Sequence, residues 1–132
     1  MPQLSLILEE LLPLEPIFHT AAFGLTQADR ERRMAPDYWE IGASGRRYTR
    51  DFILTVDQAH FIDADTAGWT ASDQAVRQLG PATYLFTYTL LQGDRLSRRA
   101  TVWEQSAAGW IILYHQGTLV APDAANINPS NS

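Results

Sequence analysis

The stretch TYLFTYTLLQGDRLSRRATVWEQSAAGWIILYHQGTLV, residues 83–120, decides the fold. It contains three runs rich in β-branched and aromatic residues, at 83–91, 96–105 and 110–120, and this composition predicts β-strands. The turn signals between these runs are short, and short connections produce antiparallel hairpins. A further run at 69–79 precedes the Gly80-Pro81 turn. We therefore predict a four-stranded antiparallel meander in the second half of the chain.

The first half of the chain has the patterns of helices. Leucine and isoleucine recur at helical spacing from Leu4 until Pro13 interrupts the backbone hydrogen bonding. Thr26, with Asp29 three residues later, has the capping-box pattern of a helix start. Thr49 is a second candidate N-cap. We predict helices over 4–12, 26–35 and 49–59, and a short strand over 37–44.

Helices that precede a sheet indicate an α+β protein. The predicted order is α-α-β-α-β-β-β-β, with three N-terminal helices packed in the concave face of a strongly curved, mainly antiparallel sheet. Such a sheet forms a cone-shaped barrel whose mouth can hold a small molecule. We predict one domain over 1–120 and a flexible C-terminal tail over 121–132, which is rich in Asn, Pro and Ser.

Composition excludes several classes of chemistry. The 132 residues include no cysteine, so disulfides, thiolate metal sites and a cysteine nucleophile are excluded. They include no lysine either, which excludes Schiff-base chemistry. The net charge of −5 argues against a nucleic-acid partner. No apolar run approaches the length of a membrane-spanning helix, and the N-terminus lacks the pattern of a secretory signal. The expectation is a cytoplasmic protein without a membrane partner.

Three segments carry a resemblance to a known family: DYWEIGASGRRYTR at 37–50, SRRATVW at 97–103 and GWIILYHQGT at 109–118. They resemble an uncharacterised SnoaL-like family of the nuclear transport factor 2-like superfamily, close to the polyketide cyclases and distantly similar to ketosteroid isomerase. The resemblance spans roughly residues 4–120. It implies the cystatin-like α+β cone and a homodimer, and it implies function poorly because this fold hosts many activities.

Glu40 is the candidate catalytic acid or base. A glutamate buried between Trp39 and Ile41 would have a raised pKa and could transfer protons near neutral pH. Strand alternation alone, with Trp39 and Ile41 in the core, would instead turn Glu40 outward. The resemblance favours a role in the site, so both orientations stay open at this point.

The other candidates lie on the strands and at one loop. On the last strand, alternation separates the face of Trp110 and Gln116 from the face of His115. The resemblance implies that the Trp110 face lies toward the interior and the His115 face on the convex side. Arg99 is either a ligand contact or a surface charge at the rim of the sheet. The predicted ligand-binding residues are Ser44, Tyr48, Arg99, Thr101, Trp103 and Gln116. The predicted dimer-interface residues are Ile111, Leu113 and His115.

The sequence thus predicts a small-molecule pocket protein, and leaves open whether it is an enzyme. If it is one, the expected chemistry is acid–base catalysis of the isomerase, cyclase or dehydratase kind, with no cofactor and an apolar or aromatic substrate. The alternative is a non-catalytic homodimeric binding module. His60, Asp63 and Asp65 indicate a hydrated loop more than a metal site, so no metal is predicted. The arginines near residues 46–50 are the only support for a ribonuclease, which the acidic net charge opposes.

Overall fold

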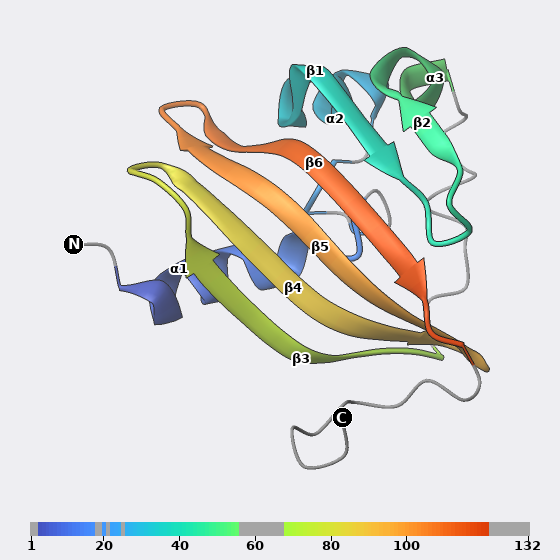
Figure 1. Cartoon of the computed structure of the whole chain (residues 1–132). Helices are drawn as coiled ribbons and strands as arrows, with labels where there is room; N and C mark the ends of the chain where they lie inside the picture. Colours follow the sequence, from blue (N-terminus) through green and yellow to red (C-terminus); the bar gives the residue numbers. More distant parts are fainter. Residues whose placement is uncertain (1–2, 18–19, 21, 25, 56–67, 122–132) are drawn as a thin grey trace.

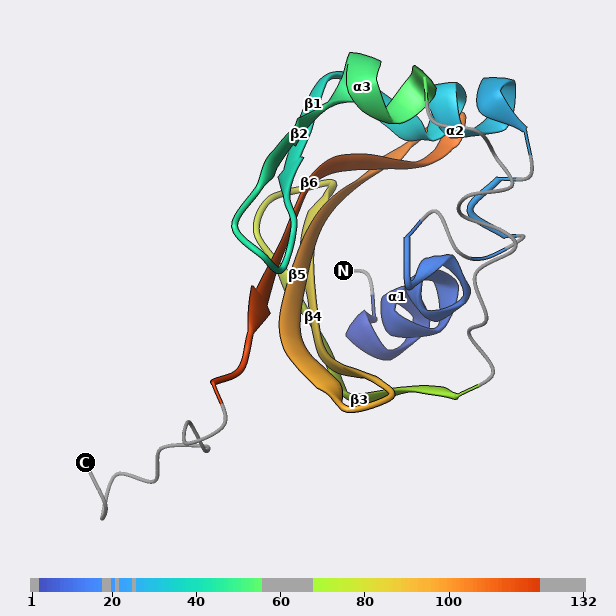
Figure 2. The ribbon, with the colours of Figure 1, turned by 90° about the vertical axis from the view of Figure 1, so that its right-hand side faces the viewer.

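The computed structural model describes residues 3–17, 20, 22–24, 26–55 and 68–121. In these ranges a six-stranded sheet curves around the N-terminal helix (Figures 1 and 2). The helical elements are α1 (Leu4–Leu11), the 3-10 turn η1 (Leu12–Leu14), α2 (Gln27–Arg33) and α3 (Arg50–Thr55). The strands are β1 (Met34–Ile41), β2 (Arg47–Thr49), β3 (Trp69–Gln78), β4 (Thr83–Gln92), β5 (Arg95–Ser106) and β6 (Gly109–Leu119).

The sheet has the strand order β2-β1-β6-β5-β4-β3. The four strands from β3 to β6 form the predicted antiparallel meander, and β1 joins β6 in parallel. The α+β class and the curved sheet are confirmed. The sheet is open, however, and does not close into the predicted barrel. It also has one strand more than predicted, because β2 adds three residues to its edge.

Helix α1 lies against the concave face of the sheet (Figure 2). Ile7 and Leu11, four residues apart, are buried, whereas Leu4 and Leu12 at the ends of the predicted stripe are largely exposed. Helices α2 and α3 lie at the other end, beside β1 and β2. No helix in the described part of the chain is both long and apolar enough to span a membrane.

Both predicted caps on the later helices are present. Thr26 accepts a hydrogen bond from the Asp29 backbone N–H at 3.0 Å, and the Asp29 carboxylate accepts one from the Thr26 backbone N–H, so the capping box is complete. The side chain of Thr49 accepts a hydrogen bond from the backbone of Phe52 at the start of α3. Helix α2 ends at Arg33, two residues before the predicted end, since β1 already begins at Met34. Residues 56–67 and the tail from 122 lie outside the described residues.

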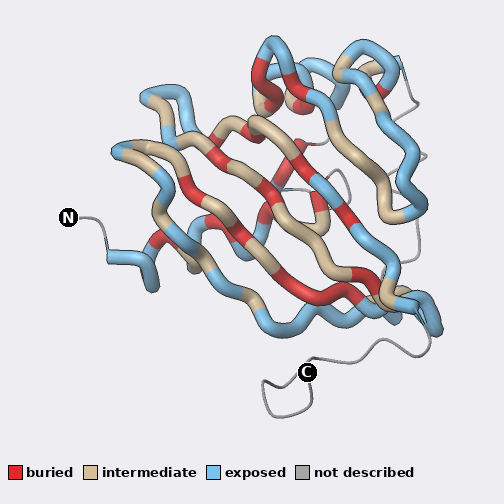
Figure 3. The backbone as a smooth tube through the Cα atoms, viewed as in Figure 1, coloured by how far each residue is buried: buried red, intermediate tan, exposed pale blue. Residues whose placement is uncertain are grey.

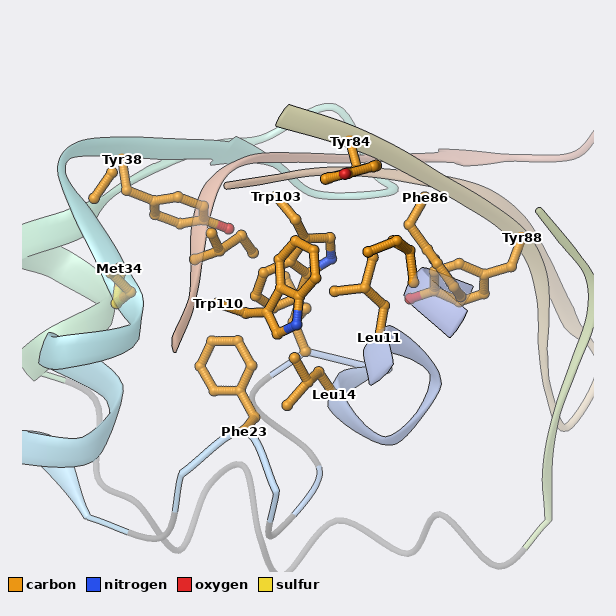
Figure 4. Packing of buried hydrophobic residues seen from close by; sticks show 14 of the residues in the cluster. Leu11, Leu14, Phe23, Met34, Tyr38, Tyr84, Phe86, Tyr88, Trp103 and Trp110 are labelled. Atoms are coloured by element: carbon orange, nitrogen blue, oxygen red, sulfur yellow. The ribbon is translucent and has the colours of Figure 1, made fainter. Parts of the chain in front are cut away.

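Buried positions run along β4, β5 and β6 (Figure 3), and their side chains form one hydrophobic cluster with residues of the N-terminal segment. Trp103 of β5 is completely buried and packs edge-on against Phe23, with ring centroids 6.1 Å apart. Leu11 and Leu14 from the N-terminal segment belong to the same cluster (Figure 4). The concave face is therefore closed by aromatic and aliphatic packing along much of its length, and polar groups there must find partners inside.

Two irregularities decide which side chains point inward. In β6 the register shifts between the pairs Val102–Tyr114 and Trp103–Ile112, so Leu113 is an extra residue. In β1 it shifts between Met34 and Trp39. An inserted residue reverses the alternation of every side chain beyond it.

Candidate functional site

Buried polar side chains gather on the concave face where β1, β4, β5 and β6 lie side by side. Tyr38, Tyr88 and Trp103 project from three of these strands toward the interior (Figure 4). Because directly opposite residues share a face, the register also places Glu40 with His115, and His115 with Thr101. The result is one polar cluster inside an otherwise apolar layer.

Glu15 is the most connected member of this cluster. It follows η1, between Pro13 and Pro16, and enters the core from the N-terminal segment. Its Oε1 accepts a hydrogen bond from the Tyr88 hydroxyl at 2.9 Å, and its Oε2 accepts one from Trp103 Nε1 at 3.0 Å. The site thus provides donors to both oxygens of Glu15.

Burial raises the pKa of Glu15 from 4.5 to about 7, against the hydrogen bonds from Thr101, Tyr88 and Trp103 and the charge of Arg99, which all lower it. Removing a carboxylate from water is costly, and here that cost exceeds the gain from its donors. With both oxygens occupied, Glu15 holds its neighbours in place and has little capacity left for a ligand.

Glu40 differs from Glu15 because only one of its two carboxyl oxygens accepts a hydrogen bond in the described ranges. Its Oε1 accepts a hydrogen bond from Tyr38 at 2.9 Å. Its Oε2 has no hydrogen-bond partner in the described ranges, and it is not among the polar atoms enclosed without a partner. Burial raises the pKa of Glu40 from 4.5 to about 7, while Tyr38 and the charge of Arg99 lower it. A carboxyl group that titrates near neutrality and keeps one oxygen open is suited to proton transfer.

Glu40 faces inward because Trp39 is accommodated on the outer face. The Trp39 ring packs edge-on against Tyr114 at a centroid distance of 5.2 Å, and the Arg47 guanidinium lies over it at 5.7 Å. These contacts leave Trp39 partly covered outside the core. Alternation then places Tyr38 and Glu40 together on the concave side.

His115 extends the cluster by one hydrogen bond, because its Nδ1 lies 2.7 Å from Thr101 Oγ1. The tautomer of the ring decides whether Nδ1 donates this bond or accepts it. Nε2 is enclosed without a partner in the described part of the chain. Burial lowers the pKa of His115 from 6.5 to about 3, so the ring is neutral.

Arg99 is the cation of the cluster. Its Nε donates to Ser97 Oγ at 2.9 Å, and its Nη2 donates to Gln92 Oε1 at 3.4 Å. It interacts electrostatically with both Glu40 and Glu15. The charge of Arg99 therefore lowers the pKa values of two buried carboxyl groups, but the opposing effect of burial keeps both values near 7.

No protein-family model and no curated protein sequence matches this chain. Solved structures do match. A protein with a cystatin-like fold from Caulobacter vibrioides superposes with a TM-score of 0.63 at 19% identity, covering 94% of each chain. An NTF2-like protein from Cytophaga hutchinsonii matches with a TM-score of 0.61 at 17% identity, covering 91% of this chain and all of the other. A putative Ca/calmodulin-dependent kinase II association domain from Exiguobacterium sibiricum has a TM-score of 0.61 at 18% identity, covering 93% and 98%.

The chain has the cystatin-like fold of NTF2-like proteins. This confirms the fold that the resemblance implied, and at these identities the likeness concerns the fold alone. The closer similarity to SnoaL-like proteins stays a prediction.

Within this NTF2-like fold, the predicted ligand-binding residues separate into three groups. Thr101 and Trp103 are fully buried; Trp103 donates to Glu15 and Thr101 pairs with His115, so both support the cluster from within. Arg99 and Tyr48 are half-buried, and Tyr48 lies directly opposite Glu40. Ser44 is exposed in the turn between β1 and β2.

Gln116 and His115 lie on the opposite faces of β6 from those predicted, so their predicted placement is wrong. Alternation counted from Trp110 is interrupted at Leu113, so beyond that residue the two faces of β6 exchange. His115 is buried on the concave side, and Gln116 is exposed on the outer face, where its amide oxygen accepts a hydrogen bond from Tyr114. His115 thus cannot belong to an outer-face dimer contact. Ile111 and Leu113 are half-buried, and their role at an interface stays a prediction.

Sequence reasoning missed Glu15, Tyr38 and Tyr88. A signal for Glu15 exists in the strands. Trp103 and Tyr88 carry polar atoms on predicted core strands, and buried indole and phenol groups need partners. A carboxylate in a short, proline-bounded segment next to the first helix was an available acceptor.

Proposed function

We propose that this protein binds a small molecule beside Glu40 and Arg99 and acts on it by proton transfer, with Glu40 as the catalytic acid or base. The observation that supports this most is the contrast between the two buried glutamates. Both have pKa values near 7, yet only Glu40 keeps an open oxygen.

The neighbours of Glu40 have positioning roles in this proposal. Tyr38 fixes one oxygen of the carboxyl group and so directs the other. Arg99 stabilises the ionised form of Glu40 and can stabilise negative charge that develops on the bound molecule. Glu15, held by Trp103 and Tyr88, keeps the interior of the cluster rigid.

The experiment uses the elimination of 5-nitrobenzisoxazole, in which a base removes the ring proton and the N–O bond breaks to give a coloured cyanophenolate. This probe reports a carboxylate base that is partly removed from water. We expect a rate that rises with pH through about 7, as Glu40 ionises. In Glu40→Gln the rate should fall by at least about tenfold, because the base is lost.

Glu104→Gln is the matched control, since Glu104 lies on the outer face of β5 opposite Ile111. It should keep the wild-type rate and pH profile. Equal rates in wild type and Glu40→Gln, whether high or absent in both, would contradict the proposed catalysis.

A homodimeric binding module is the second candidate, because the outer face of the meander is uncovered. This face carries a groove of about 520 Å³ whose lining includes Leu85, Ala100, Val102 and Tyr114. The association domain from Exiguobacterium sibiricum, named for assembly, has the same fold. A dimer of ordinary size would bury about 1,600 Å² in total.

Sedimentation at micromolar concentration tests this candidate. We expect a dimer for the wild type and a monomer for Val102→Arg, which places a charge in the groove. A monomeric wild type would contradict it. Neither result bears on the elimination assay.

A further inference from the structure

Arg99 is a half-buried cation whose hydrogen-bond partners are all neutral. Ser97 and Gln92 accept from its Nε and Nη2. Its Nη1 has no partner in the described ranges and is not enclosed, so it can be reached from solvent. Within the same ranges Arg99 forms no ion pair with a carboxylate. A guanidinium group in this setting has an open position for an anion, and its planar set of donors fits a carboxylate group.

A second cation reinforces the positive charge at this end of the face. Burial lowers the pKa of Arg99, and the charge of Arg95, which is exposed four residues earlier on β5, lowers it further. Glu40 and Glu15 offset this charge only from a distance, and near neutral pH each is partly protonated. The positive charge is therefore not fully compensated inside the protein.

The partners of Arg99 stand beside apolar side chains. Gln92 lies opposite Trp69 of β3, which is half-buried. Ser97 lies opposite Leu119 of β6, which is 42% exposed. Residues directly opposite share a face of the sheet, so Trp69 lies on the face of Gln92 and Leu119 lies on the face of Ser97.

Arg99 itself lies opposite Gly117. The turn between β1 and β2 approaches here, since a Cβ atom at Gly117 would be 3.3 Å from Ala43. The missing side chain lets this turn, which carries Ser44, lie against the concave face next to Arg99. Glu40 leads into the same turn from β1, so its carboxyl group and the guanidinium lie at one end of the cluster.

We propose that the ligand of this site is a small organic acid, bound as its carboxylate by Arg99 with its apolar body against Trp69 and Leu119. This inference takes the location of the site from the proposed function and adds the class of ligand. Glu40 in its protonated form donates its proton toward the bound carboxylate. Binding therefore takes up a proton, and affinity weakens as pH rises and Glu40 ionises.

Other titratable or charged groups also face Glu40, and they set the pH range of this coupling. They are Tyr38 on its own strand, Tyr48 on β2, His115 on β6, Arg99 on β5, Tyr88 on β4 and Glu15 from the N-terminal segment. The tyrosines Tyr38 and Tyr88 have raised pKa values and stay neutral, and His115 is neutral above about pH 3. Near pH 7 the two glutamates change charge.

The test compares benzoate with benzamide, which has the same ring and no charge. Calorimetry on the full chain at about pH 6 should show benzoate binding more tightly than benzamide by about tenfold or more. In Arg99→Gln, benzoate should bind about 10- to 100-fold more weakly, with benzamide unchanged. Arg98→Gln is the matched control, because Arg98 is the adjacent residue on the outer face and bonds Thr89. It should leave both affinities unchanged.

Equal affinity for the two probes, or equal benzoate affinity in wild type and Arg99→Gln, would overturn the inference. Circular dichroism of Arg99→Gln confirms that the variant is folded. The two proposals fail separately. If Glu40→Gln leaves the elimination rate unchanged while Arg99→Gln loses benzoate, the catalytic proposal fails and the carboxylate site stands. If the elimination depends on Glu40 and benzoate binding does not depend on Arg99, the reverse holds.

Discussion

Replacing Glu40 by glutamine should change how the stability of the protein depends on pH. The folded-state pKa of Glu40 is raised from 4.5 to about 7, so the folded protein holds this proton more tightly than the unfolded chain. The free energy of unfolding therefore falls as pH rises between these two values. A shift of this size corresponds to about 3 kcal/mol for a buried group. Glutamine accepts the Tyr38 hydroxyl in the same way and does not titrate.

The assay is urea unfolding followed by tryptophan fluorescence at several pH values. The quantity to compare is the difference in free energy of unfolding between Glu40→Gln and wild type at each pH. Between pH 4.5 and pH 7 this difference should move in favour of Glu40→Gln by up to about 3 kcal/mol. His115 acts in the opposite direction, since its pKa is lowered from 6.5 to about 3, but it contributes equally to both proteins. Parallel curves of stability against pH for the two proteins would refute the assigned burial of Glu40.

Three further changes test the cluster and the fold. Tyr38→Phe removes the donor to Glu40 and should raise the pKa of Glu40, so that the pH profile of the elimination rate has its inflection above about pH 7. An inflection at or below the wild-type pH would contradict the role of Tyr38. Thr101→Val removes the hydrogen-bond partner of His115 Nδ1 and should lower the free energy of unfolding in urea by about 1–3 kcal/mol, because a buried polar atom then loses its partner. An unchanged midpoint would argue against this hydrogen bond. Thr26→Ala should lower the free energy of unfolding by about 1 kcal/mol and speed the hydrogen exchange of the first α2 amides. Unchanged exchange rates would show that the capping box does not stabilise the helix.

The meander was predictable because its turns have strong local signals. Gly93 and Gly109 both have positive φ angles, 67° and 114°, in the connections where glycine signals a hairpin. The predicted strand ends accordingly lie within about two residues of those observed. Strand β2 escaped prediction because three residues carry too little periodicity, and it forms only by pairing with β1.

The orientation of side chains was less predictable than the strands themselves. The extra residue at Leu113 has no signature in the run of apolar residues around it, and it reverses which of His115 and Gln116 is inside. The inward position of Glu40 depends on Trp39 finding partners in Tyr114 and Arg47 from other strands. Such tertiary contacts override local alternation, so a sequence pattern leaves both outcomes open.

Strand β3 forms one border of the open sheet, and its irregular middle has a consequence for self-association. Its pairing with β4 is regular up to Ser72 and resumes at Ala75, with Asp73 in the left-handed region at φ 57°. A smooth border of ten residues would present a continuous row of amides and carbonyls to any extended peptide. Here the row is broken in the centre, where the charged Asp73 is exposed. A foreign strand could add only short pieces on either side, so this border is protected against uncontrolled polymerisation.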